Sequence, residues 1–138
     1  MIVIDDAQDT STEALLMLKA MTNFEADSSH RITFILAGQP ELATILQYSH
    51  FDALRARIRL SHTLVPMSLE ETIGYIDHGL KIVNYAGSLF SDNAKIEIFR
   101  RTGGIARAIN SLCYRAILDG AIEQKRVIDT ADVPHDAG

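Results

Sequence analysis

The feature that most constrains the fold of this chain is a short hydrophobic run that ends in two adjacent acids near the N-terminus. Residues 2–4 read Ile-Val-Ile, and Asp5 and Asp6 follow directly. A continuous β-branched run of this kind is typical of a strand that is buried on both faces of a parallel sheet. We therefore expect residues 2–4 to form such a strand, with both carboxylates emerging at its C-terminal end.

The segments up to Pro66 alternate between helical and extended patterns. A capping-box pattern at residues 10–13, with Thr10 as the N-cap, predicts a helix that runs to about Phe24. After a polar loop at 25–29, the sequence predicts a strand at 31–37, short helices at 42–46 and 51–58, and a third strand at 62–65. Strands that alternate with helices indicate a parallel α/β sheet.

Beyond Pro66 the pattern becomes entirely helical. Ser68 and Glu71 form a second capping box, and Gly87 is expected to end the helix that follows. The remaining predicted elements are a helix from Ser91 or Asp92 to the Gly103-Gly104 pair, a helix from Ile105 to residues 120–124, and a short extended piece with the start of another helix at 127–133.

The distribution of charge excludes some classes of partner. The formal net charge is −5, from 13 basic and 18 acidic residues. Residues 1–30 alone have a net charge of −5, whereas residues 31–66, with four arginines, have a net charge of +2. This balance argues against a broad nucleic-acid-binding face. Because no apolar run approaches the roughly 18 residues of a membrane span and a single cysteine fits a reducing cytosol, we expect a cytoplasmic protein.

A hydrophobic strand that ends in two acids has the form of a Walker B element. In this interpretation Asp5 binds Mg²⁺ directly or through water, and Asp6 orients or deprotonates the attacking water. Taken alone, the pair would favour the simpler interpretation, in which the two acids are solvated loop charges that cap the next helix.

Several motifs that follow in order along the chain resemble one family. They are Asp-Asp-Ala-Gln at 5–8, Ala-Gly-Gln-Pro-Glu-Leu at 37–42, Leu-Arg-Ala-Arg-Ile at 54–58, Pro-Met-Ser-Leu-Glu-Glu-Thr at 66–72 and Gly-Gly-Ile-Ala-Arg-Ala-Ile-Asn at 103–110. Over about residues 2–133 the chain resembles the C-terminal half of an AAA+ ATPase of the ExeA/GspA kind, which is linked to type II secretion. TniB/TnsC transposition ATPases share much of this pattern.

The resemblance implies a fold and a division of the chain. The fold is α/β, with a partial P-loop NTPase (AAA+) parallel sheet that lacks its first strands, followed by an all-α lid subdomain. The partial core would occupy residues 1–66 and the lid residues 67–133, and we expect residues 134–138 to be a disordered tail.

The resemblance also assigns roles in ATP hydrolysis to three residues of the predicted sheet. Asp5 would be the Mg²⁺-binding acid. Asp6 stands where the family usually has glutamate, the base that activates water, and its side chain is one methylene shorter, so hydrolysis could be slow or altered in geometry. Gln39, at the exit of the second strand, occupies the sensor 1 position next to the γ-phosphate or the attacking water.

Three arginines complete the set that the resemblance implies. Arg57 matches the arginine finger that acts on the nucleotide of a neighbouring subunit, and Arg55 is the alternative. Arg107 matches the sensor 2 arginine of the lid, which binds the nucleotide. A finger that acts in trans implies a homo-oligomer. The resemblance itself implies a further partner, from a secretion machinery or a transposition system.

The motif for a phosphate-binding loop, G-x-x-x-x-G-K-[ST], does not occur in these 138 residues. In the family this loop precedes the Walker B strand, so we expect the chain to be a fragment of an ATPase that is inactive alone. Its predicted three-stranded sheet would have an apolar edge that favours pairing with another copy. The alternatives are a non-catalytic interaction module, a remnant of an ATPase gene, or a segment of a transposition-type ATPase.

Overall fold

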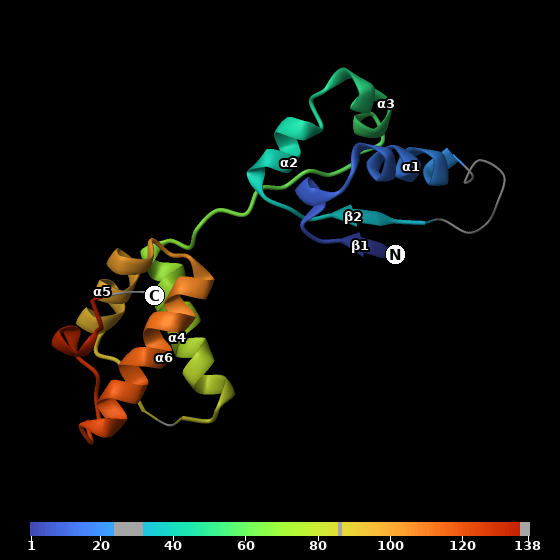
Figure 1. Ribbon diagram of the computed structural model, residues 1–138. Coiled ribbons are helices and arrows are strands. Elements are labelled where there is room, and N and C mark those ends of the chain that lie inside the picture. Colours follow the sequence, from blue (N-terminus) through green and yellow to red (C-terminus); the bar gives the residue numbers. More distant parts are fainter. Residues whose placement is uncertain (24–31, 86, 136–138) are drawn as a thin grey trace. The chain divides into compact units, whose positions relative to one another are not determined.

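The computed structural model describes residues 1–23, 32–85 and 87–135. These divide into two compact units, residues 1–63 and residues 64–138, each with its own hydrophobic core (Figure 1). The predicted polar loop at 25–29 and the last residues of the predicted tail, 136–138, lie outside the described residues.

The first unit is built on a two-stranded parallel sheet. Strand β1 (Ile2–Ile4) pairs with β2 (Phe34–Leu36), with Val3 opposite Ile35 at the centre of the register. On the other face of the pleat, the side chains of Ile4, Phe34 and Leu36 pack against the core of this unit. The predicted parallel pairing of these two segments is therefore present, in a mixed α/β fold. The prediction that the first strand is buried on both faces is wrong, because Val3 is 55% exposed on the face away from this core.

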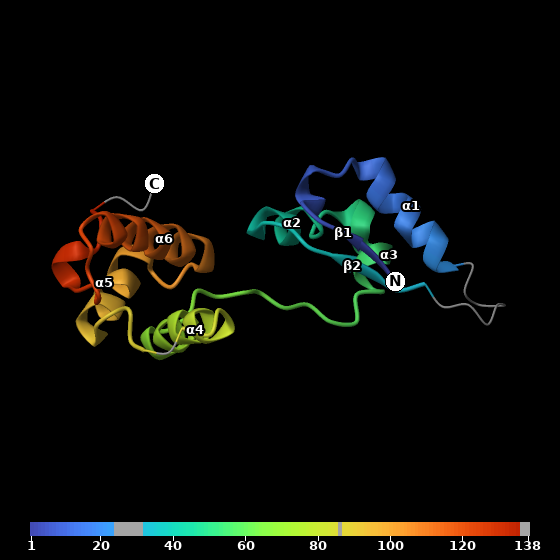
Figure 2. The ribbon, with the colours of Figure 1, turned by 90° about the horizontal axis from the view of Figure 1, so that it is seen from below.

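One face of the sheet is covered by helices. Helices α1 (Thr12–Asn23), α2 (Pro40–Ile45) and α3 (Asp52–Arg55) lie on the same side of the two strands, together with the 3₁₀ turns η1 (Ala7–Asp9) and η3 (Ser49–Phe51) (Figures 1 and 2). The buried side chains that these elements contribute to the core are Ala7, Leu15, Leu18, Leu42, Leu46, Phe51 and Leu54.

The predicted N-cap of the first helix is wrong by one residue. Ser11, and not Thr10, accepts a hydrogen bond at its Oγ from the backbone N–H of Ala14, at 3.2 Å. Thr10 is still part of the preceding turn, because its own N–H donates to the carbonyl of Ala7 at 3.3 Å. The turn η1 therefore delays the start of α1 to Thr12.

The predicted third strand at residues 62–65 is absent, and within the described residues the sheet has two strands. Leu64 and Val65 are 89% and 80% exposed, and residues 58–67 carry neither helix nor strand. A β-branched pattern forms a strand only where a neighbouring strand satisfies its backbone groups, since strand propensity depends strongly on context. Among the described residues this segment pairs with no such neighbour.

The second unit is entirely helical apart from one isolated bridge. Helix α5 (Asp92–Thr102) packs against both α4 (Leu69–Ile82) and α6 (Ala106–Ile122) (Figure 1). The C-terminal segment returns through a bridge between Phe90 and Ile128 and ends in the 3₁₀ turn η4 (Thr130–Asp132). The core is formed by Ile76, Phe90, Ala94, Ile98, Ile109, Leu112, Ala116, Ile128 and Val133.

The predicted start of α4 is confirmed. The N–H of Glu71 donates to Ser68 Oγ at 3.2 Å, and the N–H of Ser68 donates to the Glu71 carboxylate at 2.8 Å. These hydrogen bonds from Ser68 hold the pKa of Glu71 below its ordinary value. The reciprocal pair satisfies two backbone donors at the start of the helix.

The predicted end of α4 at Gly87 is wrong. The helix ends at Ile82, and Asn84 adopts a left-handed conformation with φ 55°. The N–H of Asn84 donates to the carbonyl of Lys81, and the N–H of Tyr85 donates to the carbonyl of Leu80 at 3.1 Å. This is a Schellman motif in which asparagine takes the place usually held by glycine.

The two strongest motifs of the second unit meet through their backbones. The N–H of Met67 donates to the carbonyl of Gly104 at 2.9 Å. Gly104 has φ +78°, and a Cβ atom placed there would lie 2.0 Å from the carbonyl oxygen of Met67. Glycine is therefore required at this position both for its conformation and for space. None of the helices of the described residues is long and apolar enough to cross a membrane.

We predict that Gly104→Ala destabilises the second unit by about 3 kcal/mol or more, because it combines a left-handed conformation with a steric overlap. Gly103 is the matched control. It is also left-handed, with φ +58°, but a Cβ there meets no atom within 4 Å, so Gly103→Ala should cost only about 1 kcal/mol. Urea unfolding detected by NMR reports each unit separately, and equal losses for the two variants would contradict the prediction.

Candidate functional site

The candidate site lies at the edge of the sheet where β1 and β2 end. Because the strands are parallel, the residues that follow each of them emerge at the same edge. Asp5 and Asp6 follow β1, and Gln39 follows β2. The N–H of Ala7 donates to the carbonyl of Ala37 at 2.9 Å, so the backbone pairing continues beyond the strands. The predicted Walker B and sensor 1 segments are therefore neighbours.

The backbone at Asp6 is unusual. Its φ of 47° and ψ of 42° are left-handed, a conformation that aspartate and asparagine tolerate better than most other residues. The N–H of Asp6 donates to Asp5 Oδ1 at 3.0 Å, and the carbonyl of Asp6 accepts from the N–H of Asp9 at 2.9 Å. The chain thus turns sharply after the strand and leaves both carboxylates exposed at the edge of the sheet.

Gln8 links the two segments, and no role was assigned to it from the sequence. Its Nε2 donates to Asp6 Oδ1 and to Asp9 Oδ2, each at 3.2 Å. Its Oε1 accepts a hydrogen bond from the backbone N–H of Gln39 at 3.0 Å. Asp6 and Gln39 are thus joined through one carboxamide. The only signal in the sequence was the position of Gln8 in the Asp-Asp-Ala-Gln motif.

The glycine at position 38 makes room for this carboxamide. A Cβ atom at Gly38 would lie 2.5 Å from Gln8 Oε1 and 3.3 Å from the backbone nitrogen of Ala7. The space beside β2 is therefore filled by the Gln8 side chain, and a larger residue at position 38 would compete with it.

The exposed carboxylates fit one part of a magnesium site. Mg²⁺ is usually bound by one or two carboxylates, with phosphate oxygens and waters as the other ligands. Asp5 and Asp6 meet the first requirement. Within the described ranges no cluster of three or more His, Cys, Asp or Glu could hold a metal ion by itself. The donor set therefore suits a metal that arrives with a phosphorylated ligand.

The two predicted finger arginines differ in their contacts. Arg55 is held by the first unit itself, because Nη1 donates to the carbonyl of Leu46 at 2.9 Å and Nη2 pairs with Asp52 at 2.6 Å. Arg57 donates from Nη1 to the carbonyl of Ala53 at 2.8 Å, and its side chain is exposed. Arg55 thus joins the end of α2 to α3, whereas Arg57 is displayed at the surface.

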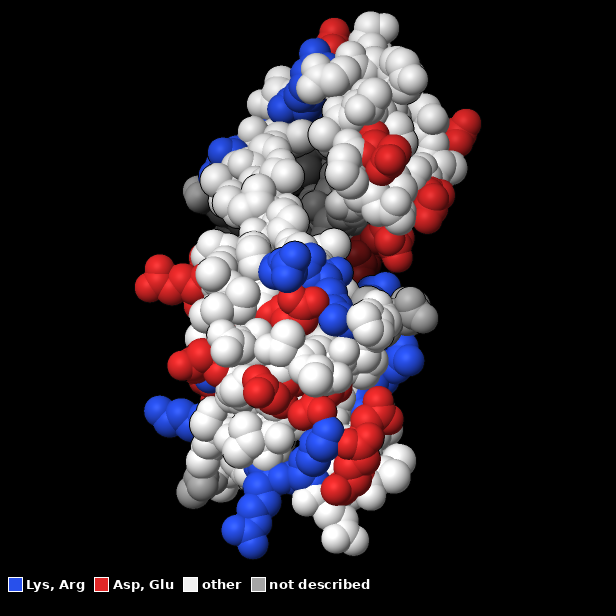
Figure 3. All heavy atoms as spheres, turned by 90° about the vertical axis from the view of Figure 1, so that its left-hand side faces the viewer, with Lys and Arg blue, Asp and Glu red and all other residues white. Residues whose placement is uncertain are grey.

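Arg107 lies in the first turn of α6, on the second unit, and is exposed. No side chain caps this end of the helix. A positive charge in the first turn opposes the helix dipole, so this arginine does not stabilise its own helix. On the face of the second unit visible in Figure 3, acidic and basic side chains are interspersed.

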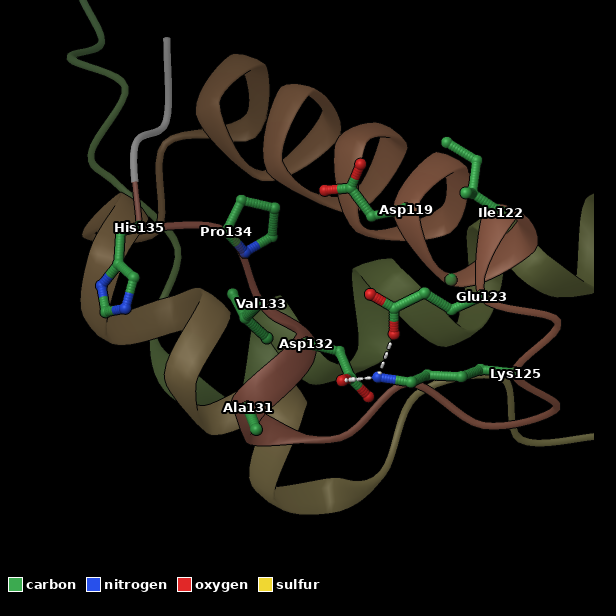
Figure 4. A pocket seen from close by; sticks show the side chains of 10 residues that line it. Asp119, Ile122, Glu123, Lys125, Ala131, Asp132, Val133, Pro134 and His135 are labelled. Carbon is green, nitrogen blue, oxygen red and sulfur yellow. Dashed lines mark hydrogen bonds and ion pairs between the residues drawn. The ribbon is translucent and has the colours of Figure 1, made fainter.

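A pocket of about 510 Å³ on the second unit lies between the end of α6 and η4 (Figure 4). Lys125 reaches across it and pairs with Glu123 at 2.6 Å and with Asp132 (Figure 4). These two carboxylates raise the pKa of Lys125 above its ordinary value, and Lys125 lowers the pKa of Asp132. Lys125 is therefore paired with two of the acidic residues that line the pocket, and its contact with Asp132 ties the end of α6 to the C-terminal turn.

The comparisons with known proteins agree with these motifs. Residues 1–46 match the family described as an AAA domain. Over 117 residues, which are 85% of this chain, the sequence is 31% identical to general secretion pathway protein A of Aeromonas hydrophila. Together these similarities support an AAA-type ATPase segment of the ExeA/GspA kind.

The match to the secretion protein covers 21% of that relative's length. The AAA-type segment described here thus corresponds to about a fifth of the relative. AAA-type proteins bind nucleotides in general, and they often assemble as oligomers. The mixed α/β first unit, with its short parallel sheet, agrees with a partial AAA fold followed by a helical part.

The contacts of the arginines lead to a prediction on stability. Arg55→Ala should destabilise the first unit of this AAA-type segment by about 1 kcal/mol, because it removes the hydrogen bond to Leu46 that joins the end of α2 to α3 and the ion pair with Asp52 within α3. The nearby Arg59 is exposed, and Arg59→Ala should change the free energy of unfolding by no more than about 0.5 kcal/mol. NMR-detected urea unfolding of the first unit measures both, and an equal effect of the two substitutions would contradict the assignment.

Proposed function

We propose that this chain supplies the Walker B, sensor 1 and lid parts of an ATP-hydrolysing AAA+ ATPase. The observation that carries the proposal is the meeting of Asp5, Asp6 and Gln39 at the carboxyl edge of β1 and β2. In open α/β sheets, ligands bind at this edge of the strands. A carboxylate for the metal, a second carboxylate for water and an amide from the next strand are the groups that phosphoryl transfer to water requires.

Each of these three residues has one role in the proposed mechanism. Asp5 holds Mg²⁺ through its exposed carboxylate; when bound, the ion supplies positive charge that neutralises the phosphate oxygens. Asp6 orients the attacking water and accepts its proton. The Gln39 side chain positions the same water or the γ-phosphate. Because aspartate is one methylene shorter than the glutamate usual in the family, we expect slow turnover.

We expect an oligomer because an arginine finger acts on the nucleotide of a neighbouring copy. Arg57 reaches the nucleotide of a neighbouring copy as the arginine finger, and its exposed side chain on α3's C-terminal side supports this choice. Arg55 is the weaker alternative because its guanidinium forms an ion pair with the Asp52 carboxylate and its side chain is only 39% exposed. Arg107 of the lid binds the nucleotide phosphates as sensor 2.

The proposed biological context is secretion, from the cytoplasmic side, with a partner from the secretion machinery. Its support is the similarity to general secretion pathway protein A. The second candidate is a non-catalytic interaction module, which the absence of the G-x-x-x-x-G-K-[ST] motif from the 138 residues favours. A transposition role for the same ATPase segment would call for a different partner and the same chemistry.

We predict that the 138-residue chain alone does not bind ATP tightly. Asp5, Asp6, Gln39 and Arg107 offer no group of backbone donors for the phosphates, and such donors are what a phosphate-binding loop supplies. Titration with a fluorescent ATP analogue in the presence of Mg²⁺ measures the affinity. A micromolar dissociation constant would contradict the prediction and show that the segment holds a complete nucleotide site.

In the intact ATPase that carries this segment, Arg57→Ala should reduce ATP turnover by about 10³-fold or more while ATP binding is retained. The reason is that a finger acts on the transition-state charge in the neighbouring subunit. Arg59→Ala, two positions along the same exposed segment, is the control and should leave turnover unchanged. Steady-state hydrolysis and equilibrium ATP binding are measured for both, and unchanged turnover of Arg57→Ala would exclude it as the finger.

A further inference from the structure

We propose that Gln8 is a positioning residue, which holds the Asp6 carboxylate in a fixed relation to the segment that begins at Gln39. This inference rests on the proposed function, because Asp6 is there the group that activates water. It adds a residue that acts through Asp6 and touches neither nucleotide nor water.

The first observation is that both ends of the Gln8 carboxamide are engaged. Nε2 donates its two N–H groups to Asp6 and Asp9, and Oε1 accepts from the N–H of Gln39. The last of these bonds spans 31 residues of sequence. A flexible side chain that is bound at both ends loses its rotamer freedom, so it can act as a rigid spacer between the two strand ends.

The second observation concerns Asp6 itself. Gln8 binds Oδ1 of the carboxylate, and among the described residues Oδ2 has no hydrogen-bond partner. One oxygen of this exposed carboxylate is therefore held, while the other makes no hydrogen bond among the described residues. Hydrogen bonds that fix the orientation of a catalytic group and leave its reactive atom available are a general device for preorganisation.

The third observation is that the local chemistry favours a carboxamide at this position. The site presents one N–H donor on the side of Gln39 and carboxylate acceptors at Asp6 and Asp9, so the side chain must accept at one atom and donate at the other. Glutamate would place a further negative charge among these acids. Leucine has a similar size and can make none of the bonds.

Gly38 provides an independent way to move the carboxamide. A Cβ at position 38 would lie 2.5 Å from Gln8 Oε1, the end of a flexible side chain that can swing away. Gly38→Ala should therefore displace Gln8 without changing it. The proposal therefore requires Gly38→Ala and Gln8→Leu both to speed the hydrogen exchange of the Gln39 amide.

The first arm of the test uses the 138-residue chain. Hydrogen exchange of the Gln39 amide should become about tenfold faster in Gln8→Leu and in Gly38→Ala, since the amide loses its acceptor. Gln47→Leu, at an exposed glutamine of the same unit, is the matched control and should leave this rate unchanged. Unaltered exchange in Gln8→Leu would show that the carboxamide does not bridge the two segments, and would overturn the proposal.

The second arm uses the intact ATPase that carries this segment. Gln8→Leu should lower kcat by about 10- to 100-fold with the KM for ATP unchanged, because the residue acts on the water-activating group and not on nucleotide binding. In an Asp6→Asn background, Gln8→Leu should cause no further loss of kcat, since it acts only through Asp6.

The outcomes separate the two proposals. Additive losses of kcat in the double variant, or parallel changes in kcat and KM, would assign Gln8 a merely structural role and overturn its positioning role. Wild-type kcat in Gln8→Leu, with faster exchange at Gln39, would overturn it as well. If the intact wild-type protein does not hydrolyse ATP, the proposed function fails, and the positioning role fails with it even if the exchange arm shows the bridge.

Discussion

The parallel pairing of β1 with β2 is the constraint on which the candidate site depends. Two short strands alone bury little surface, yet their register places the two acids and Gln39 at one edge. The pairing continues through the hydrogen bond from Ala7 to Ala37, so the segments that follow the strands remain side by side at this point. Hydrogen bonds between segments that are distant in the sequence thus bring the two acids and Gln39 together in one site.

The same principle operates in the second unit, where a backbone contact organises two motifs far apart in sequence. The close approach of Met67 and Gly104 places the start of α4 beside the start of α6. Only glycine fits at position 104, because any side chain there would overlap the carbonyl oxygen of Met67. These two motifs of the second unit therefore have a packing role, and Arg107 is exposed in the first turn of α6, next to this contact.

Local patterns were predicted well from the sequence where the interacting groups lie within a few residues of each other. The capping box at Ser68 and the end of α5 at Gly103 belong to this class. The errors arose where another local structure competed. The turn at 7–9 moved the cap from Thr10 to Ser11, and Asn84 ended α4 before Gly87 could do so.

By itself the sequence determined the first two strands and the helices of both units, the two carboxylates after β1 and the resemblance to AAA-type ATPases. Only the tertiary structure decided that residues 62–65 find no strand to pair with among the described residues, that Arg55 binds its own unit, and that Gln8 joins Asp6 to Gln39. The physical reason is the range of the interactions. Helix caps depend on neighbours a few positions away, whereas a hydrogen bond across 31 residues exists only once the sheet has aligned its two ends.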